Sequence, residues 1–412
     1  MMRRRELLRM AAGLAFAPAA VDTRRQARPL PKGEFDYVDW SWARWREITR
    51  QVRPSVSTPQ AGRAELLDLV DPAKAVATAQ QWTERQRAIR ATVSVFLGEP
   101  PAPAAPLVSE TLEETVEASH VRRRIRFRAG TGEWIPAYLL VPRRSRPGAP
   151  MPAVLCPHQT TQEGKREPAG IAGNPEQAIA LHLVERGFVA LTWDAICFGE
   201  RHDPASGHYG DAIPFYAAHP GWSLLAKMIA DLSRAVDYLS TLDFVDPSRI
   251  GCAGHSHGGI TTIVGMALEP RLAAGASNCG FDTFRIDGNV WRWSHATALI
   301  PRLGFYASSP YLSMDRYRAV PDSEVIQVPF DLHEVLALAA PRPLLLSTSD
   351  DDFVFPNAGW SVRMALPRVK AVYTALGAPD HLRATFFGGG HRLSAAVARE
   401  MYAWLERTLK RA

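Results

Sequence analysis

Hydrophobic positions follow a helical period in the first part of the chain and alternate between strand and helix patterns after it. Over residues 35–97 the apolar side chains recur mostly at the spacing of amphipathic helices, most clearly in Gln81–Leu97. Residues 100–106 are rich in Pro and Ala and are typical of a linker. We therefore expect a leader and helical arm over residues 21–106, followed by a larger domain over residues 107–412.

The larger domain shows short apolar runs separated by amphipathic helical stretches. His120–Phe127 and Trp134–Val141 alternate as the strands of a hairpin do, around the turn Gly130-Thr131-Gly132. The later apolar runs have the length of buried strands and lie at Ala153–Cys156, Phe188–Asp194, Ile250–Ala253, Ala274–Cys279, Pro343–Ser349 and Leu382–Phe387. The helical stretches lie at Pro175–Arg186, Ser223–Leu242, Ile260–Leu268, Ala358–Leu376 and Ser394–Arg411. This alternation predicts an α/β fold: a mostly parallel, eight-stranded sheet with helices on both faces and an antiparallel hairpin at its edge.

Residues 281–333 break this rhythm and are rich in Trp, Arg and Pro. Such a segment is typical of an insertion near a functional site, because loops held by a rigid scaffold carry many binding residues. We expect it to line a pocket at the carboxyl ends of the strands, where ligands bind in parallel sheets. The candidate substrate contacts are Arg201, Trp222 and Trp291, and surface packing explains each of them equally well.

The sequence Gly254-His255-Ser256-His257-Gly258 is the most specific chemical signal in the chain. It follows the apolar run that ends at Ala253 and precedes the helical stretch that begins at Ile260. A strand, a tight turn with a central Ser and a helix form a nucleophile elbow, which holds the Ser in a strained conformation and exposes its hydroxyl. The flanking glycines are required because a side chain there would collide with the neighbouring strand or helix. Ser256 is therefore the candidate nucleophile.

A serine hydroxyl needs a base to take its proton and an acid to orient that base. His391 is the candidate base, because it follows three glycines in the loop between the last strand and the last helix. The candidate acid lies among three adjacent carboxylates that end at Asp352, after the preceding strand. We favour Asp352, since a Pro stands four residues after it, and Asp351 remains an alternative. The order Ser, Asp, His differs from the orders of chymotrypsin and subtilisin.

An oxyanion formed during acyl transfer is stabilised by two N–H donors. The amide of His257, directly after the nucleophile, is one candidate. The second is expected in the loop Pro157–Thr161, where Gln159 is the best single choice. His255 is expected to pack against the elbow or orient it, and His158 to shape its loop.

Together these motifs resemble the α/β-hydrolase superfamily, and within it the serine esterases related to dienelactone hydrolase and acetyl xylan esterase. The subgroup resemblance is carried by Pro157–Thr161, Gly164-Lys165, Glu167-Pro168, Asp194, Phe198–Arg201, Asp246–Gly251, Trp82, Arg85, Arg87 and Leu97-Gly98. It covers nearly all of the chain after the N-terminal segment, and it implies the α/β-hydrolase fold and metal-independent ester hydrolysis without a cofactor. Dienelactone hydrolase itself uses a Cys nucleophile, so Ser256 favours ordinary esters over lactones.

The leading hypothesis is an acetylesterase-like serine carboxylic ester hydrolase. It would act through an acyl-enzyme on acetyl or other short acyl esters of small molecules or oligosaccharides. A peptidase of the prolyl-oligopeptidase type shares the triad, but it usually carries a β-propeller, for which residues 35–106 are too short and too helical. A non-catalytic binding protein of this fold would lack a triad member. A metallohydrolase using His255 and His257 is disfavoured, because no second ligand pair occurs at a regular spacing.

The net charge and the N-terminal segment indicate which partners the protein has and where it is located. The chain has 412 residues, a net charge of +6 and a pI near 9.2. Residues 1–20 resemble a twin-arginine signal peptide, with Arg3-Arg4-Arg5 before an apolar stretch and Ala17-Pro18-Ala19 as a candidate cleavage site. Its removal would take away four Arg and one Glu and leave a charge of +3 on a periplasmic or secreted protein. No basic run interleaved with aromatics points to nucleic acid, and no apolar run approaches the roughly 18 residues of a membrane span.

The chain has four cysteines, none of them in a C-x-x-C pair, which argues against a zinc ribbon. We expect most of them to be buried free thiols that act as small hydrophobic side chains. Cys156 and Cys252 fall on strands expected to be neighbours. A disulfide between them is therefore the alternative in an oxidising compartment.

Overall fold

The computed structural model describes residues 42–56, 76–101, 105–143, 149–206, 209–284, 293, 297–306 and 328–410. The signal peptide and leader predicted from the sequence lie outside these residues, as do Trp291 and most of the 281–333 segment. The division into an arm and a catalytic domain stays a prediction. In the described part of the chain, every helix is too short or too polar to cross a membrane.

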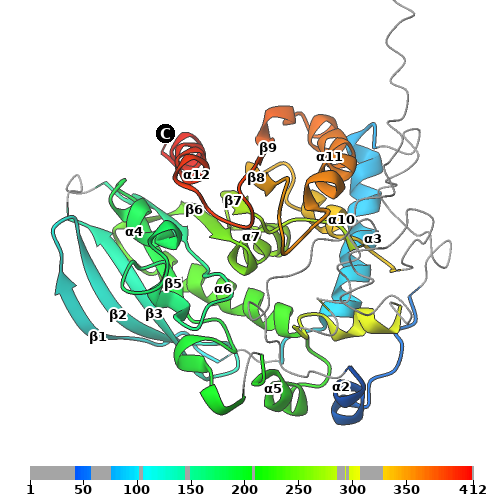
Figure 1. Ribbon diagram of the computed structural model, residues 1–412, viewed down its shortest axis with the longest axis horizontal. Coiled ribbons are helices and arrows are strands. Elements are labelled where there is room, and N and C mark those ends of the chain that lie inside the picture. Colours follow the sequence, from blue (N-terminus) through cyan, green and yellow to red (C-terminus); the bar gives the residue numbers. More distant parts are fainter. Residues whose placement is uncertain are drawn as a thin grey trace, which may run out of the picture.

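A single nine-stranded sheet forms the centre of the described structure (Figure 1). Its strands are β1 Ser109–Val116, β2 His120–Arg128, β3 Trp134–Pro142, β4 Met151–Leu155, β5 Val189–Trp193, β6 Val245–His255, β7 Ala274–Asn278, β8 Leu344–Ser349 and β9 Leu382–Phe387. Their order across the sheet is β1-β2-β3-β5-β4-β6-β7-β8-β9. The pairs from β1 to β5 are antiparallel and those from β5 to β9 are parallel. The predicted mostly parallel α/β sheet with a hairpin on one side is confirmed.

Strand β1 was not predicted, and it makes the sheet nine-stranded rather than eight-stranded. The sequence of Ser109–Val116 lacks the alternation of apolar and polar residues that would signal a strand, and nearly all of its residues are exposed. Its partner β2 is rich in Arg, and Arg123–Glu114 at 2.8 Å and Arg126–Glu110 at 2.6 Å bridge the two strands. Opposite charges facing each other across strands contribute about 0.2–1 kcal/mol each. Backbone pairing with β2 and these ion pairs therefore hold an edge strand that buries little apolar surface.

Helices cover both faces of the sheet (Figure 1). The α-helices are α2 Trp42–Thr49, α3 Ala79–Leu97, α4 Ile179–Val184, α5 Ala212–Ala218, α6 Leu224–Ser240, α7 His257–Leu268, α10 Leu332–Ala337, α11 Ala358–Ala375 and α12 Ala395–Leu409. Side chains of α3, α6, α7, α10 and α11 belong to the larger core cluster on one face, whereas those of α4 and α12 belong to the cluster on the other face. The single helix expected over Pro175–Arg186 is wrong. A 3-10 turn at Pro175–Gln177 precedes α4, because Ala178 leaves the helical conformation with ψ at 51°.

The predicted helix Gln81–Leu97 corresponds to α3, and its ends follow local rules. The Thr78 hydroxyl accepts a hydrogen bond from the Gln81 amide and caps the helix start. Gly98 ends the helix at a φ of 75°, where a Cβ would also collide with the backbone of Gly221. Trp82 and Phe96 of this helix are buried in the larger core cluster. The arm is therefore packed on the main core.

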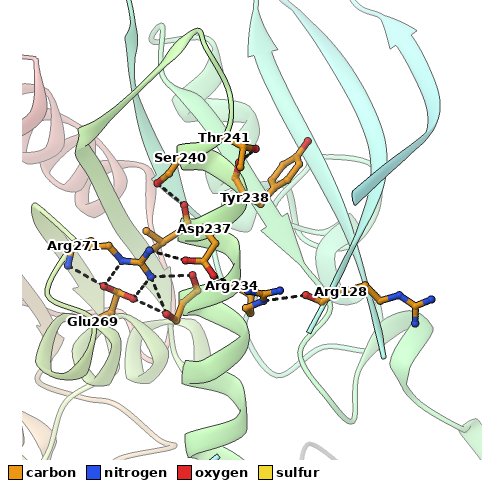
Figure 2. Close-up of polar contacts among 10 residues, drawn as sticks. Arg128, Arg234, Asp237, Tyr238, Ser240, Thr241, Glu269 and Arg271 are labelled. Atoms are coloured by element: carbon orange, nitrogen blue, oxygen red, sulfur yellow. Dashed lines mark hydrogen bonds and ion pairs between the residues drawn. The ribbon is translucent and has the colours of Figure 1, made fainter. Parts of the chain in front are cut away.

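Polar contacts in the C-terminal half of α6 fasten this helix to its neighbours (Figure 2). The Arg271 guanidinium donates to Glu269 at 2.9 and 2.7 Å and to Asp237 of α6 at 2.6 Å. Arg234 of α6 donates to the Arg128 carbonyl of β2 at 3.2 Å. These contacts tie α6 to the segment after α7 and to the sheet. They fix the position of α6, which packs beside α7.

The alternative of a disulfide between Cys156 and Cys252 is ruled out by strand register. Leu155 pairs with Cys252 across β4 and β6, so Cys156 lies on the opposite face of the sheet from Cys252. Their side chains accordingly belong to different core clusters. All four cysteines are buried and free.

Candidate active site

Ser256 lies at the turn between β6 and α7, in a backbone conformation with φ at 53° and ψ at −120°. A positive φ is strained for any residue other than Gly, and such strain is typical of functional sites. A Cβ on Gly254 would collide with the backbone of Gly258, and one on Gly258 would collide with the Pro157 carbonyl. The two glycines thus permit the tight approach of strand, helix and the loop after β4.

His391 bridges Ser256 and Asp352. Its Nε2 lies 2.8 Å from the Ser256 Oγ, and its Nδ1 lies 2.7 Å from the Asp352 Oδ2. An ionised carboxylate only accepts, so Nδ1 carries the proton and Nε2 is left to accept from the hydroxyl. The side chains of His391 and Asp352 are 8% and 1% exposed, so the relay is shielded from water. The structure therefore brings together the three residues expected from the sequence, which follow strands β6, β8 and β9 at one end of the sheet (Figure 1).

The three adjacent carboxylates make three different contacts. Asp350 pairs with Arg363 at the surface. Asp351 accepts from the amides of Gly389 and Gly390 at 2.9 Å each, and these donors hold its pKa below the ordinary value. Asp352 alone contacts His391. Asp351 thus fastens the loop that carries His391, and Asp352 contacts His391 itself.

Asn278 at the end of β7 is a site residue that the sequence analysis missed. Its carbonyl accepts from the Ser256 amide at 2.9 Å. Its side-chain amide donates to His255 Nδ1 at 2.7 Å and to the Arg392 carbonyl at 3.0 Å. Burial lowers the pKa of His255 well below its ordinary value, and the nearby His391 lowers it further. The expected role of His255 in orienting the elbow agrees with these contacts. No sequence motif marks Asn278.

The loop after β4 lies beside the start of α7. The His257 side chain is buried next to His158, Phe198 and Tyr209, and burial lowers its pKa to about 3. Its main chain begins α7, where the first amides have no partner within the helix. The Gln159 side chain donates to Glu167 at 3.0 Å. Thr160, the next residue, lines the pocket above Ser256.

A pocket that opens beside Ser256 encloses about 400 Å³ of space continuous with solvent. It is lined by Thr160, Tyr209, Ser256, His257, Ile260, Trp293, Thr297, Leu299, Val354 and Phe355. The wall is largely apolar and aromatic. Trp293 is 2% exposed, and its indole N–H has no acceptor in the described part of the chain.

Arg201 and Trp222 were expected to contact substrate, and they lie among buried groups outside the lining of this pocket. Arg201 pairs with Asp231 at 2.8 Å and with Glu133 at 3.2 Å, and it also donates to the Asp194 carbonyl. Trp222 packs against Phe215 and His219. Both residues support the loops around the site. Trp291 lies outside the described residues.

One cluster in the described part of the chain has donor atoms close enough to hold a metal ion. Cys279, Asp352 and His391 have donor atoms within 4.8 Å of one another. Two of the three are bonded to each other, and His391 also contacts Ser256. The carboxylate–imidazole–hydroxyl relay accounts for this cluster. The pair His255 and His257 does not form such a donor group, since His255 is bonded to Asn278.

Comparison with known families agrees with an esterase. A family model described as "Glucuronyl esterase, fungi" matches residues 154–377. YtaP of Bacillus subtilis, described as a hydrolase, is 26% identical over 308 residues, which cover 74% of this chain and 93% of that protein. A 4-O-methyl-glucuronoyl methylesterase of Phanerochaete carnosa is 24% identical over 212 residues, which cover 47% of this chain and 48% of that protein. This chain therefore spans about half the length of that methylesterase.

Solved structures share the fold. A glucuronoyl esterase from Solibacter usitatus superposes with a TM-score of 0.61 at 18% identity, covering 86% of this chain and 98% of that one. A Bacteroides fragilis protein assigned as an acetyl xylan esterase gives 0.54 at 18% identity, covering 75% and 76%. At these identities the likeness shows the α/β-hydrolase fold, which confirms the fold expected from the sequence.

Proposed function

The chain belongs to the glucuronyl esterase family, and from this premise we propose that it is a serine carboxylic ester hydrolase acting on carbohydrate esters through an acyl-enzyme. The observation that carries the proposal is the chain of two short contacts from Asp352 through His391 to Ser256. The strained elbow and the adjoining pocket support it. A role without catalysis would leave the strain and the relay without a purpose.

In the first half-reaction, Ser256 Oγ attacks the ester carbonyl while His391 Nε2 takes its proton. The Oγ–C bond forms, and the carbonyl electron pair becomes an oxyanion next to the His257 amide and the loop after β4. The intermediate collapses, the bond to the leaving alcohol breaks, and the alcohol takes the proton from His391. Asp352 keeps the imidazole in the required tautomer and stabilises its positive charge.

In the second half-reaction, water takes the place of the alcohol. His391 removes a proton from that water, the hydroxide attacks the acyl carbon, and the bond to Ser256 breaks. The serine regains its proton from His391, and the carboxylic acid leaves. Each oxyanion donor is expected to contribute on the order of 10²–10³ to kcat. Water is the only co-reactant.

Two ester classes differ in where the sugar lies: in uronoyl esters it is the acyl part, and in acetyl esters it is the alcohol. We give uronoyl esters precedence, since the family and the methylesterase relative carry that substrate in their names. Short acyl esters such as acetate are the second class.

Labelling with a fluorophosphonate tests the mechanism. Wild-type protein should be labelled with one equivalent of probe, and Ser256→Ala should not be labelled. A matched control is Ser361→Ala, a buried serine on α11 whose hydroxyl donates to Thr283, whereas the Ser256 hydroxyl contacts His391. Labelling that survives Ser256→Ala would overturn the assignment of the nucleophile.

A substrate panel tests the ester class. Methyl glucuronate, acetylated xylan and p-nitrophenyl acetate, butyrate and octanoate should be compared by kcat/KM. We expect the highest value for the uronate ester. A higher value for the acetyl esters would move the substrate to the second class and leave the mechanism intact.

We also propose that residues 1–20 direct export of the protein. Expression of the full chain followed by fractionation should place the shortened protein outside the cytoplasm. Replacement of Arg4 and Arg5 by Lys should retain it inside, if the twin-arginine motif is the signal.

A further inference from the structure

The loop after β4 contains a buried histidine whose proton position follows from its partners. His158 is 2% exposed. Its Nε2 lies 3.1 Å from the Ala195 amide, and its Nδ1 lies 2.6 Å from the Gln159 carbonyl oxygen. A backbone amide only donates, so Nε2 accepts and the single ring proton sits on Nδ1. Burial lowers the pKa of His158 from its ordinary value and favours this neutral form.

This tautomer fixes the peptide between Gln159 and Thr160. The Gln159 carbonyl points at the His158 ring as the acceptor of the Nδ1 proton. In a trans peptide the C=O and N–H point in opposite directions, so the Thr160 N–H points away from that ring. Thr160 lines the same pocket as Ser256 and His257. In the described part of the chain, the Thr160 amide has no hydrogen-bond acceptor.

The surrounding contacts hold the rest of this loop in place. The Gln159 side chain donates one of its two amide hydrogens to Glu167, which fixes the position of that side chain. Lys165 is fixed to Asp194 through its amide at 2.8 Å and its ammonium at 2.6 Å. The His158 carbonyl lies against Gly258 of α7. The Gln159–Thr160 peptide is therefore the part of the loop whose orientation depends on His158.

We propose that the Thr160 amide, in place of Gln159, is the second oxyanion donor, and that His158 is the positioning residue that holds it toward Ser256. The assignment rests on the proposed acyl transfer at Ser256. When a substitution removes the hydrogen bond from His158 Nδ1, the Gln159–Thr160 peptide loses its restraint and can turn its carbonyl oxygen toward the oxyanion. The partial negative charge of this carbonyl oxygen would then face the oxyanion, which raises the barrier of both half-reactions.

Two near-isosteric variants separate the two hydrogen bonds of His158. In His158→Asn the side-chain N–H₂ takes the place of the Nδ1 proton, so the bond to Gln159 is kept and the bond to Ala195 is lost. In His158→Gln the side-chain oxygen takes the place of Nε2, so the bond to Ala195 is kept and the bond to Gln159 is lost. Both variants lose one buried hydrogen bond, and we expect similar decreases in melting temperature.

Catalysis should distinguish them. We expect His158→Gln to lower kcat for p-nitrophenyl acetate by about 10²-fold with little change in KM, and to weaken a trifluoromethyl ketone inhibitor by a similar factor. His158→Asn should keep kcat within about threefold of wild type, since its oxyanion donors remain. Thr160→Pro, which lacks the N–H, should lose about 10²–10³ in kcat, and Thr160→Ala, which keeps the N–H, should lose much less.

The proposal is overturned if the Asn variant loses more activity than the Gln variant, or if both lose kcat in equal measure. Retention of kcat by a folded Thr160→Pro would overturn it as well. His182→Asn, at a half-buried histidine bonded to Tyr402, is the control for histidine replacement. Fluorophosphonate labelling of the wild type separates this result from the proposed function. If Ser256 is not labelled, the acyl-transfer premise fails whatever the His158 variants do.

Discussion

Replacing Asp352 with Asn should reverse the tautomer of His391. The Asp352 Oδ1 accepts from the amides of Val354 and Phe355 at 2.8 and 2.9 Å, while Oδ2 faces His391 Nδ1. In the Asn variant the oxygen will stay where two donors point, so the N–H₂ must take the Oδ2 position. This N–H₂ group would then face the proton on His391 Nδ1, and two hydrogen-bond donors cannot bond to each other. His391 is forced to carry its proton on Nε2, where it can no longer accept from Ser256.

The magnitude follows from losing the base function while the fold is kept. A triad histidine held in the wrong tautomer lowers kcat by about 10⁴, which corresponds to about 5.5 kcal/mol of barrier. Asp351→Asn is the matched control, one residue away. An amide oxygen at its Oδ1 position still accepts from Ser349, Gly389 and Gly390. We expect kcat of this control to stay within about fivefold of wild type, because losing one weak exposed hydrogen bond costs at most about 1 kcal/mol.

The assay is kcat with p-nitrophenyl acetate at pH 8, with circular dichroism and thermal unfolding to show that both variants are folded. Retention of more than a tenth of wild-type kcat by Asp352→Asn would refute the predicted change of tautomer. A larger loss in Asp351→Asn would also refute it and would make Asp351 the acid.

Three further predictions concern stability and thiol chemistry. Lys165→Met removes the ammonium that pairs with the fully buried Asp194. Urea unfolding should show a free energy of unfolding lower by about 3–5 kcal/mol, because a buried carboxylate is left unpaired. Adding Asp194→Asn should recover part of this loss. Burial lowers the pKa of His255 and sets that of His257 to about 3, against an ordinary value of 6.5. Between pH 6.5 and 3 the unfolded chain then binds more protons at position 257 than the folded chain does. The free energy of unfolding should therefore fall as the pH drops below 6.5, by up to about 1.4 kcal/mol per pH unit from His257, and His255 acts in the same direction. His257→Gln should flatten this slope. Alkylation in denaturant without reductant, followed by mass spectrometry, should count four free thiols, and a disulfide-linked Cys156–Cys252 peptide would contradict the sheet register.

The fold was largely predictable because its signals are local. Apolar runs such as Val189–Trp193, buried at every position, indicate central strands without knowledge of the rest of the chain. β1 gave no such signal, because it depends on the Arg side chains of β2, and charge pairing leaves no hydrophobic period. The break at Ala178 was hidden for a similar reason, since its neighbours all favour a helix.

The candidate site was predictable where a motif fixes the backbone. The elbow and the loop of His391 follow from the positions of glycines and strand ends. The choice between Asp351 and Asp352 needed the direction in which each side chain leaves its turn. Arg201 was expected at the pocket because an exposed Arg and a buried, paired Arg look the same in sequence, and only the partners Asp231 and Glu133 tell them apart. Asn278 carries no motif, because its role comes from pairing between strands.

The acidic edge strand has a consequence for solubility. A sheet edge with free N–H and C=O groups is a template for aggregation, and charged side chains guard against it. A second copy of β1 approaching this edge would bring Glu110 and Glu114 toward the same carboxylates, so like charges would repel before backbone hydrogen bonds form. High salt screens that repulsion and loosens the pairs with Arg126 and Arg123. Ionic strength should therefore control self-association of this protein at a place remote from the nucleophile.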